Sequence, residues 1–132
     1  AACIAFYAPA LMGRPGESLG EAVAFVLGRD ADDARVRGAS PITYASGAFP
    51  PTMLITGNRD ELVPDESSFL MYRALADAGA KAELHVYEGA PHAFDALPDF
   101  GRQCASIMAL FLDRHVARPR EVSIAAVAAA RA

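Results

Sequence analysis

The sequence predicts an α/β fold in which helices flank a mostly parallel sheet. The apolar run over residues 52–56, ended by Gly57, is typical of a strand buried on both faces of a parallel sheet. A helical stretch and a second predicted strand, residues 82–87, follow it, and such a strand–helix–strand unit places its two strands parallel. A further strand is predicted over residues 3–8 from their β-branched and aromatic side chains.

The segment between the second and third predicted strands has the signals of a helix. Asp65 stands at the N-cap position, and Gly79 supplies the stop. Phe69, Tyr72 and Ala76 recur at helical spacing, so we expect them to form the apolar face of this helix.

A segment with two predicted helices, called the excursion below, separates the first predicted strand from the strand–helix–strand unit. Ser18 and Glu21 match a capping box, which predicts a helix that ends at Gly28. We expect Asp30 to cap a second, short polar helix that runs to Arg37. The apolar stripe of the excursion could face a substrate as part of a lid, but packing into the core is the favoured interpretation.

The chain beyond residue 97 predicts one long amphipathic helix with Pro98 at its first position. Its apolar face is expected to comprise Phe100, Cys104, Ile107, Met108, Phe111 and Leu112. Pro119 ends the helix, and we expect the Ala-rich residues 117–132 to form a frayed tail. Residues 1–116 are therefore predicted to form a single domain segment.

Composition excludes several classes of function. Hydrophobic residues make up 53% and charged residues 21%, which excludes a disordered chain. The net charge is −4 and no basic cluster is present, so nucleic acid is not an expected partner. The uncharged run over residues 1–13 is too short to span a bilayer, so no membrane span is expected. The chain opens directly in strand-like sequence without Met, and we expect it to be cut from a longer protein.

Two polar side chains follow the carboxyl ends of neighbouring predicted strands. Asp60 lies three residues past the strand that ends at Gly57, and His92 lies in the loop after residue 87. Ligands bind at the carboxyl edge of an open parallel sheet, which we call the rim. We expect Asp60 and His92 to lie together at this rim. A carboxylate that binds imidazole selects the ring nitrogen that carries the proton, and the histidine can then act as a general base.

Other ionisable residues are assigned structural roles. We expect Glu61 to be solvated, and His85, in mid-strand, and His115, at a helix end, to be structural. A metal site built from His85, His92 and Asp95 is conceivable, but no known ligand spacing supports it. Cys3 and Cys104 also lack metal-ligand spacing and are expected to be buried, free thiols.

Residues 39–42, 50–64 and 87–94 together resemble the C-terminal part of an α/β-hydrolase. The nearest branch holds the esterases and lipases, including hormone-sensitive-lipase-like and acetyl-esterase-like carboxylesterases. The resemblance covers residues 1–115 and implies that Asp60 is the acid and His92 the base of a Ser-His-Asp triad. It also implies a small acyl-ester substrate and no cofactor.

The same resemblance places the nucleophile on a Gly-x-Ser-x-Gly elbow before the strand at residues 3–8, and only Ala1 and Ala2 precede that strand. We therefore expect the nucleophile serine upstream of residue 1, in an N-terminal half that completes the fold. Ser40 is a poor substitute, because Pro41 after it has no N–H for an oxyanion hole.

Three alternatives remain open at this stage. The chain could be a non-catalytic truncated half or a docking subunit, and its isolated form is expected to have little esterase activity. Within the hydrolases, it could instead be a dienelactone-hydrolase-like or a peptidase-like relative, because the acid and histidine loops are alike across these branches.

Overall fold

The structure is a computed structural model that describes residues 1–14 and 20–131. Its sheet has the order β1-β2-β3, formed by β1 (Cys3–Phe6), β2 (Thr52–Gly57) and β3 (Ala82–Tyr87). Both strand pairs are parallel, so all three carboxyl ends lie at one edge. The predicted α/β class with a mostly parallel sheet is confirmed.

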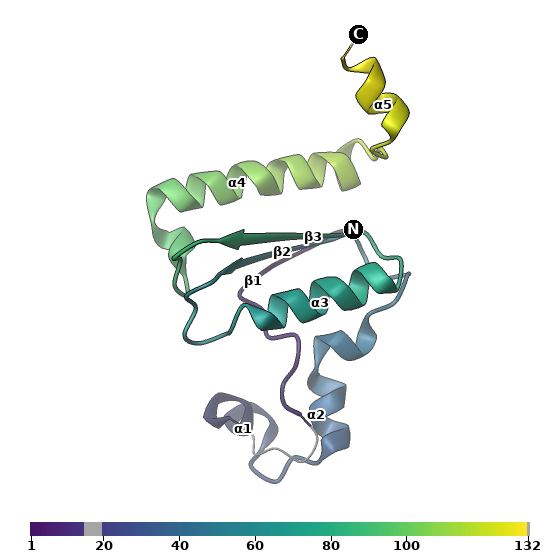
Figure 1. The fold of residues 1–132 in the computed structure, drawn as a ribbon. Helices are drawn as coiled ribbons and strands as arrows, with labels where there is room; N and C mark the ends of the chain where they lie inside the picture. The colour runs from purple at the N-terminus through teal and green to yellow at the C-terminus, as the bar shows by residue number, and fades with distance from the viewer. Residues whose placement is uncertain (15–19, 132) are drawn as a thin grey trace.

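Two helices cover opposite faces of the sheet. Helix α3 (Glu66–Asp77) lies on one face and α4 (Pro98–Leu112) on the other, which makes three layers (Figure 1). The 3₁₀ turn Phe94–Ala96 leads into α4, and Pro98 occupies the first turn of that helix as predicted.

Strand β2 is the centre of the core because every one of its residues is buried. Met53 and Ile55 point to the α4 side, where they pack with Phe111 of the helix. Leu54 points to the α3 side and packs with Leu75. Full burial of each of these large side chains contributes roughly 1.5–3 kcal/mol, so the two faces of β2 fix both helices to the sheet.

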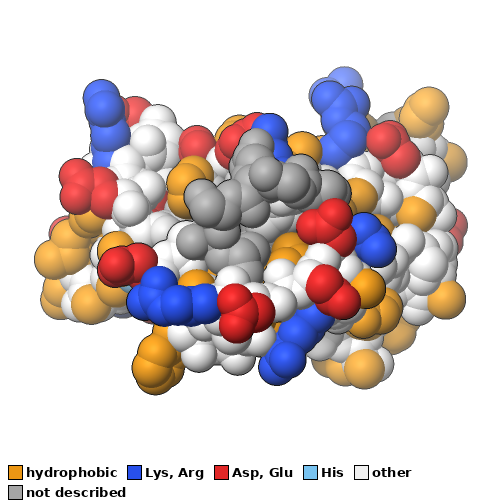
Figure 2. All heavy atoms as spheres, turned by 90° about the horizontal axis from the view of Figure 1, so that it is seen from below, with side chains coloured by type: hydrophobic (Ala, Val, Ile, Leu, Met, Phe, Trp, Pro, Cys, Tyr) orange, Lys and Arg blue, Asp and Glu red, His pale blue; other side chains and the backbone are white. Residues whose placement is uncertain are grey.

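The π-helical turn Asp113–Ala117 continues α4. The elements outside the three layers are α1 (Glu21–Leu27), α2 (Asp33–Ala39), the 3₁₀ turn Pro41–Tyr44 and α5 (Ile124–Ala129). Helices α1 and α2 lie beyond α3, whereas α5 extends away from the end of α4 (Figure 1). Acidic and basic side chains are interspersed around the face seen in Figure 2. Within the described residues, no helix has the length and apolar character needed to cross a bilayer.

The excursion helices begin later than predicted. Helix α1 starts at Glu21 with Gly20 at its N-cap, and Ser18 lies outside the described residues. Helix α2 is capped by Asp32, whose carboxylate accepts a hydrogen bond from the backbone N–H of Arg35, and not by Asp30. Asp32 stands three residues before the N–H that it caps, which is the spacing a side-chain cap requires.

The predicted apolar face of α3 is confirmed for Tyr72, which packs against the core, but it is wrong for Phe69 and Ala76. Phe69 is 47% exposed and Ala76 is exposed, whereas Met71 and Leu75 are buried, with Ser68 beside them. Met71 and Leu75 are four residues apart and therefore stack on one side of the helix, where they meet Leu54 of β2. Packing against the sheet, rather than the size of the side chains, selects the buried face.

Gly57 ends β2 at a point where the next loop comes very close. A Cβ at this position would lie 2.1 Å from the carbonyl oxygen of Ala90, which is a backbone atom that cannot turn aside. Only glycine therefore lets the loop after β2 and the loop after β3 approach each other at this edge.

We expect Gly57→Ala to lower the free energy of unfolding by more than about 2 kcal/mol, because the new methyl group forces the two loops apart. Gly38→Ala is the matched control: it lies inside α2 with open space around it, and should be neutral or stabilising by up to ~1 kcal/mol. Chemical denaturation of both variants measures the difference. Equal stability of the two variants would contradict the close approach at Gly57.

Candidate functional site

The loops after β2 and β3 are joined by backbone hydrogen bonds at the carboxyl edge of the sheet. Asn58 donates its N–H to the carbonyl of Tyr87 (3.1 Å), and Arg59 donates to the carbonyl of Ala90 (3.0 Å). The side-chain oxygen of Asn58 accepts the N–H of Gly89 at 2.7 Å. These bonds fix the two loops relative to each other, and with them the side chains that they carry.

Asp60 and His92 meet at this edge. The Nδ1 atom of His92 lies 2.8 Å from Oδ2 of Asp60, so the two residues that the sequence places on one rim are brought together. The other carboxylate oxygen, Oδ1, accepts the backbone N–H groups of Leu62 (2.9 Å) and Val63 (2.8 Å). Both oxygens are therefore engaged, and the carboxylate has a single orientation.

The surroundings of Asp60 keep it ionised. Its side chain is 0% exposed, and this burial on its own would raise the pKa of the carboxyl. The hydrogen bonds from Val63, His92 and Leu62 outweigh the burial and hold the pKa of Asp60 below its usual value. A buried carboxylate that stays charged at neutral pH stabilises a positive charge on the neighbouring imidazole.

His92 combines a fixed ring with an accessible edge. Its side chain is 34% exposed, and its second ring nitrogen, Nε2, makes no hydrogen bond to a described residue. When Nδ1 donates its proton to Asp60, Nε2 carries the lone pair and can accept a proton from a group at the rim. The pair has the geometry of a general base and its orienting carboxylate.

The Tyr7 ring packs near the imidazole, and Asp95 binds the Tyr7 hydroxyl. The ring of Tyr7, at the end of β1, lies 4.7 Å from that of His92 between centroids. The Tyr7 hydroxyl donates a hydrogen bond to the carboxylate of Asp95. Sequence reasoning did not connect Tyr7 with Asp95, because the two residues are 88 positions apart and no local pattern links them.

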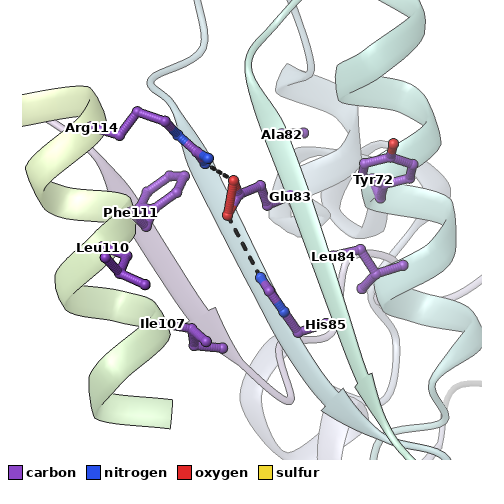
Figure 3. A pocket seen from close by; sticks show the side chains of 9 residues that line it. All are labelled: Tyr72, Ala82, Glu83, Leu84, His85, Ile107, Leu110, Phe111 and Arg114. Carbon is purple, nitrogen blue, oxygen red and sulfur yellow. Dashed lines mark ion pairs between the residues drawn. The ribbon is translucent and has the colours of Figure 1, made fainter. Parts of the chain in front are cut away.

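The rival histidines lie away from this pair. His85 lines a separate pocket of about 610 Å³ along β3, on the side of the strand that faces α4, where Glu83 lies between it and Arg114 (Figure 3). Burial lowers the pKa of His85. The Nε2 of His115 accepts a hydrogen bond from Nε of the adjacent Arg114 at 3.2 Å. No group of three potential metal ligands occurs among residues 1–14 and 20–131.

Ser40 is unsuited to act as the nucleophile for a second reason besides Pro41. It is 0% exposed, its hydroxyl donates to the carbonyl of Val36 at 2.8 Å, and it accepts the N–H of Met12 at 3.0 Å. These bonds commit Ser40 to holding the loop after β1 against the end of α2.

Ser18 also matches the Gly-x-Ser-x-Gly pattern, in Gly16-Glu17-Ser18-Leu19-Gly20. The pattern therefore occurs within this chain as well, and the expectation that it lies upstream of residue 1 overlooked this match. The elbow chemistry requires the serine at a sharp turn directly after a strand. Ser18 stands twelve residues beyond Phe6, where β1 ends, and it lies outside the described residues. Its spacing from the strand disfavours it.

The bonds to Asp60 predict a specific dependence of stability on pH. A carboxyl whose pKa is lowered by folding stabilises the fold above its unfolded pKa of about 3.9, and the stabilisation disappears as the pH falls through the lower folded value. We expect Asp60→Asn to be about 1–3 kcal/mol less stable than the parent protein at pH 7, with a gap that narrows below pH ~4. Denaturation across this pH range measures the gap.

Glu61→Gln supplies the control for this prediction, since Glu61 is exposed and adjacent to Asp60. Its effect should stay within about 0.5 kcal/mol. A difference in the free energy of unfolding between Asp60→Asn and the parent that stays constant from pH 7 to pH 3 would show that the carboxylate is not stabilised by its partners.

The chain is similar in sequence or in structure to several known proteins. The chain is 36% identical over 83 residues to the non-reducing polyketide synthase Preu3 of Preussia isomera, covering 61% of this chain and 3% of that protein. It is 38% identical over 60 residues to the esterase LipQ of Mycobacterium tuberculosis, covering 45% of this chain and 14% of that one. The propionate-bound Est2 esterase of Thermogutta terrifontis superposes with a TM-score of 0.73 at 23% identity, over 92% of this chain and 45% of that chain.

The likeness to Est2 shows the fold, and the family match described next confirms the resemblance to α/β-hydrolases. The chain spans less than half of the length of each of these relatives, which fits a C-terminal portion of the fold. Residues 17–118 match the model of the prolyl oligopeptidase family. This match covers most of the chain and includes both Asp60 and His92, and the chain therefore belongs to the prolyl oligopeptidase family of α/β-hydrolases.

Proposed function

We propose that this chain supplies the acid and the base of a Ser-His-Asp triad in a serine hydrolase that cleaves carboxylic esters. The observation that carries the proposal is the 2.8 Å contact between Nδ1 of His92 and Oδ2 of Asp60 at the carboxyl edge of a parallel sheet. The nucleophile serine and the oxyanion hole are proposed to lie upstream of residue 1, in a segment that pairs with β1.

The proposed reaction uses the two nitrogens of His92 for different tasks. Nε2 accepts the proton of the serine hydroxyl as the serine oxygen forms a bond to the acyl carbon, and then gives that proton to the departing alcohol. Nδ1 stays bonded to Asp60, whose negative charge stabilises the transient imidazolium. A water molecule then attacks the acyl-enzyme, with Nε2 again taking and returning the proton, and releases the acid.

An ester substrate is supported by the esterase LipQ among the relatives of the chain. The family description favours a second candidate, a peptidase-like relative that cleaves an amide bond with the same acid and base. The two candidates differ in the acyl and leaving groups that the complete site accepts. Parallel assays with p-nitrophenyl esters and with peptide p-nitroanilides on the protein expressed from its full coding sequence distinguish them.

In that protein we expect Asp60→Asn to lower kcat/KM for the preferred substrate on the order of 10⁴-fold, because an amide stabilises the wrong tautomer of His92. His92→Gln should lower it at least as much, since the proton acceptor is lost. His85→Gln is the matched control, because His85 lines the separate pocket beside α4 and should change the rate less than about threefold. Comparable losses for His85 and His92 would contradict the assignment.

The 132-residue chain by itself should release no burst of p-nitrophenol from an activated ester, because a covalent route requires the nucleophile elbow. A burst would contradict a nucleophile upstream of residue 1. If a burst occurs, the Ser18→Ala variant identifies its source. Loss of the burst would assign the nucleophile to Ser18, and retention of the burst would assign it to another side chain. Thr43→Ala provides a control hydroxyl, since Thr43 bonds the carbonyl of Arg37.

A further inference from the structure

We propose that Tyr7 and Asp95 form a clasp that positions His92, so that Tyr7 is a positioning residue of the site. This inference rests on the proposed function for the role of His92, whereas the clasp itself rests on contacts between side chains. It joins the end of β1 to the loop after β3, two segments that are not neighbours in the sheet.

The clasp gives the imidazole a second contact besides its hydrogen bond to Asp60. Asp60 binds one edge of the ring, and the Tyr7 ring packs on His92 at 4.7 Å between centroids, tilted by 47°. Rotation of the imidazole away from Asp60 would have to displace the Tyr7 ring. The orientation of His92 thus depends on where Tyr7 is held.

Tyr7 is held by its hydroxyl. The hydroxyl donates to the Asp95 carboxylate, and the backbone N–H of Asp95 donates back to the same oxygen at 3.3 Å. Burial, followed by the hydrogen bond to Asp95, raises the pKa of the Tyr7 phenol, so the hydroxyl keeps its proton across the neutral range. Asp95 is three residues past His92, so the bond closes the loop around the imidazole.

The backbone is strained at Tyr7 and at Ala93, the residue that follows His92. Among the described residues, only Tyr7 (φ 48°) and Ala93 (φ 59°) are non-glycine residues with positive φ. Such a conformation costs on the order of 1–3 kcal/mol and persists only where the surroundings enforce it. Tyr7 is also anchored by its N–H, which donates to the carbonyl of Ile55 at 3.0 Å. The two strained residues flank the contact between the tyrosine and histidine rings.

Phe94 provides the rigid base for the clasp. Its side chain is 2% exposed and packs in the core between the sheet and α4, and its ring meets the edge of Tyr7 at 5.5 Å. The loop is therefore anchored to the core at Phe94 and to β1 through Asp95. His92, which precedes them, has little freedom once both attachments are made.

The clasp is tested by hydrogen exchange of the loop amides in the protein expressed from its full coding sequence. Tyr7→Phe keeps the ring but removes the hydroxyl, and we expect the Asp95 amide to exchange on the order of tenfold faster. Asp95→Ala should speed exchange of the neighbouring loop amides by a similar factor. The double variant should exchange no faster than Tyr7→Phe, because removing the Tyr7 hydroxyl already removes both of its bonds to Asp95.

Tyr44→Phe is the matched control, since it also removes a tyrosine hydroxyl, one that bonds the carbonyl of Gly38 at 2.6 Å away from the site. It should leave exchange in the loop of His92 unchanged. Unchanged exchange in Tyr7→Phe, or an equal change in Tyr44→Phe, would overturn the clasp whether or not the protein is an esterase.

The positioning role is tested by steady-state kinetics of the same variants. Tyr7→Phe should lower kcat roughly tenfold with little change in KM, because a misoriented base slows the proton transfer without altering ground-state binding. Normal kcat together with faster exchange would overturn the positioning role and leave the triad intact. An inactive parent protein would instead contradict the proposed function, and the exchange experiment would still decide the clasp.

Discussion

The buried carboxylate of Asp60 is the constraint on which the rim of this sheet depends. A charged group without exposure to water is tolerated only when donors surround it, and Asp60 has three, the backbone N–H groups of Leu62 and Val63 and the imidazole of His92. Two of these donors come from its own loop, and the third comes from the loop after the neighbouring strand. The charge that would help catalysis thus also holds the two loops together.

The rest of the fold makes this meeting possible. Parallel pairing brings the carboxyl ends of β2 and β3 to one edge, and the absence of a side chain at Gly57 lets the two loops touch. The core on both faces of β2 keeps that edge in place, with α3 on one side and α4 on the other. The contact between Asp60 and His92 is therefore supported by packing that begins several residues away from it.

Local signals in the sequence predicted the parallel unit and the meeting of Asp60 with His92, because both follow from short strands, turn residues and the geometry of one crossover. The buried face of α3 was predicted correctly only at Tyr72, since the spacing of the aromatic residues outweighed the pair Met71 and Leu75 that meets the sheet. The contact between Tyr7 and Asp95 could not be predicted, because it depends on the three-dimensional path of segments far apart in the chain. The cap of α2 was missed by two residues because three aspartates lie close together there.

We propose that Asp60 orients His92 as a general base, and ¹⁵N NMR of the histidine ring nitrogens at neutral pH measures this orientation. We expect the neutral ring of His92 to carry its proton on Nδ1, hydrogen-bonded to Asp60, and Nε2 to be unprotonated. In Asp60→Asn this preference should be lost. A proton on Nε2 in the parent protein would contradict the claim, because the nitrogen facing the rim would then be a donor and could not accept a proton from serine.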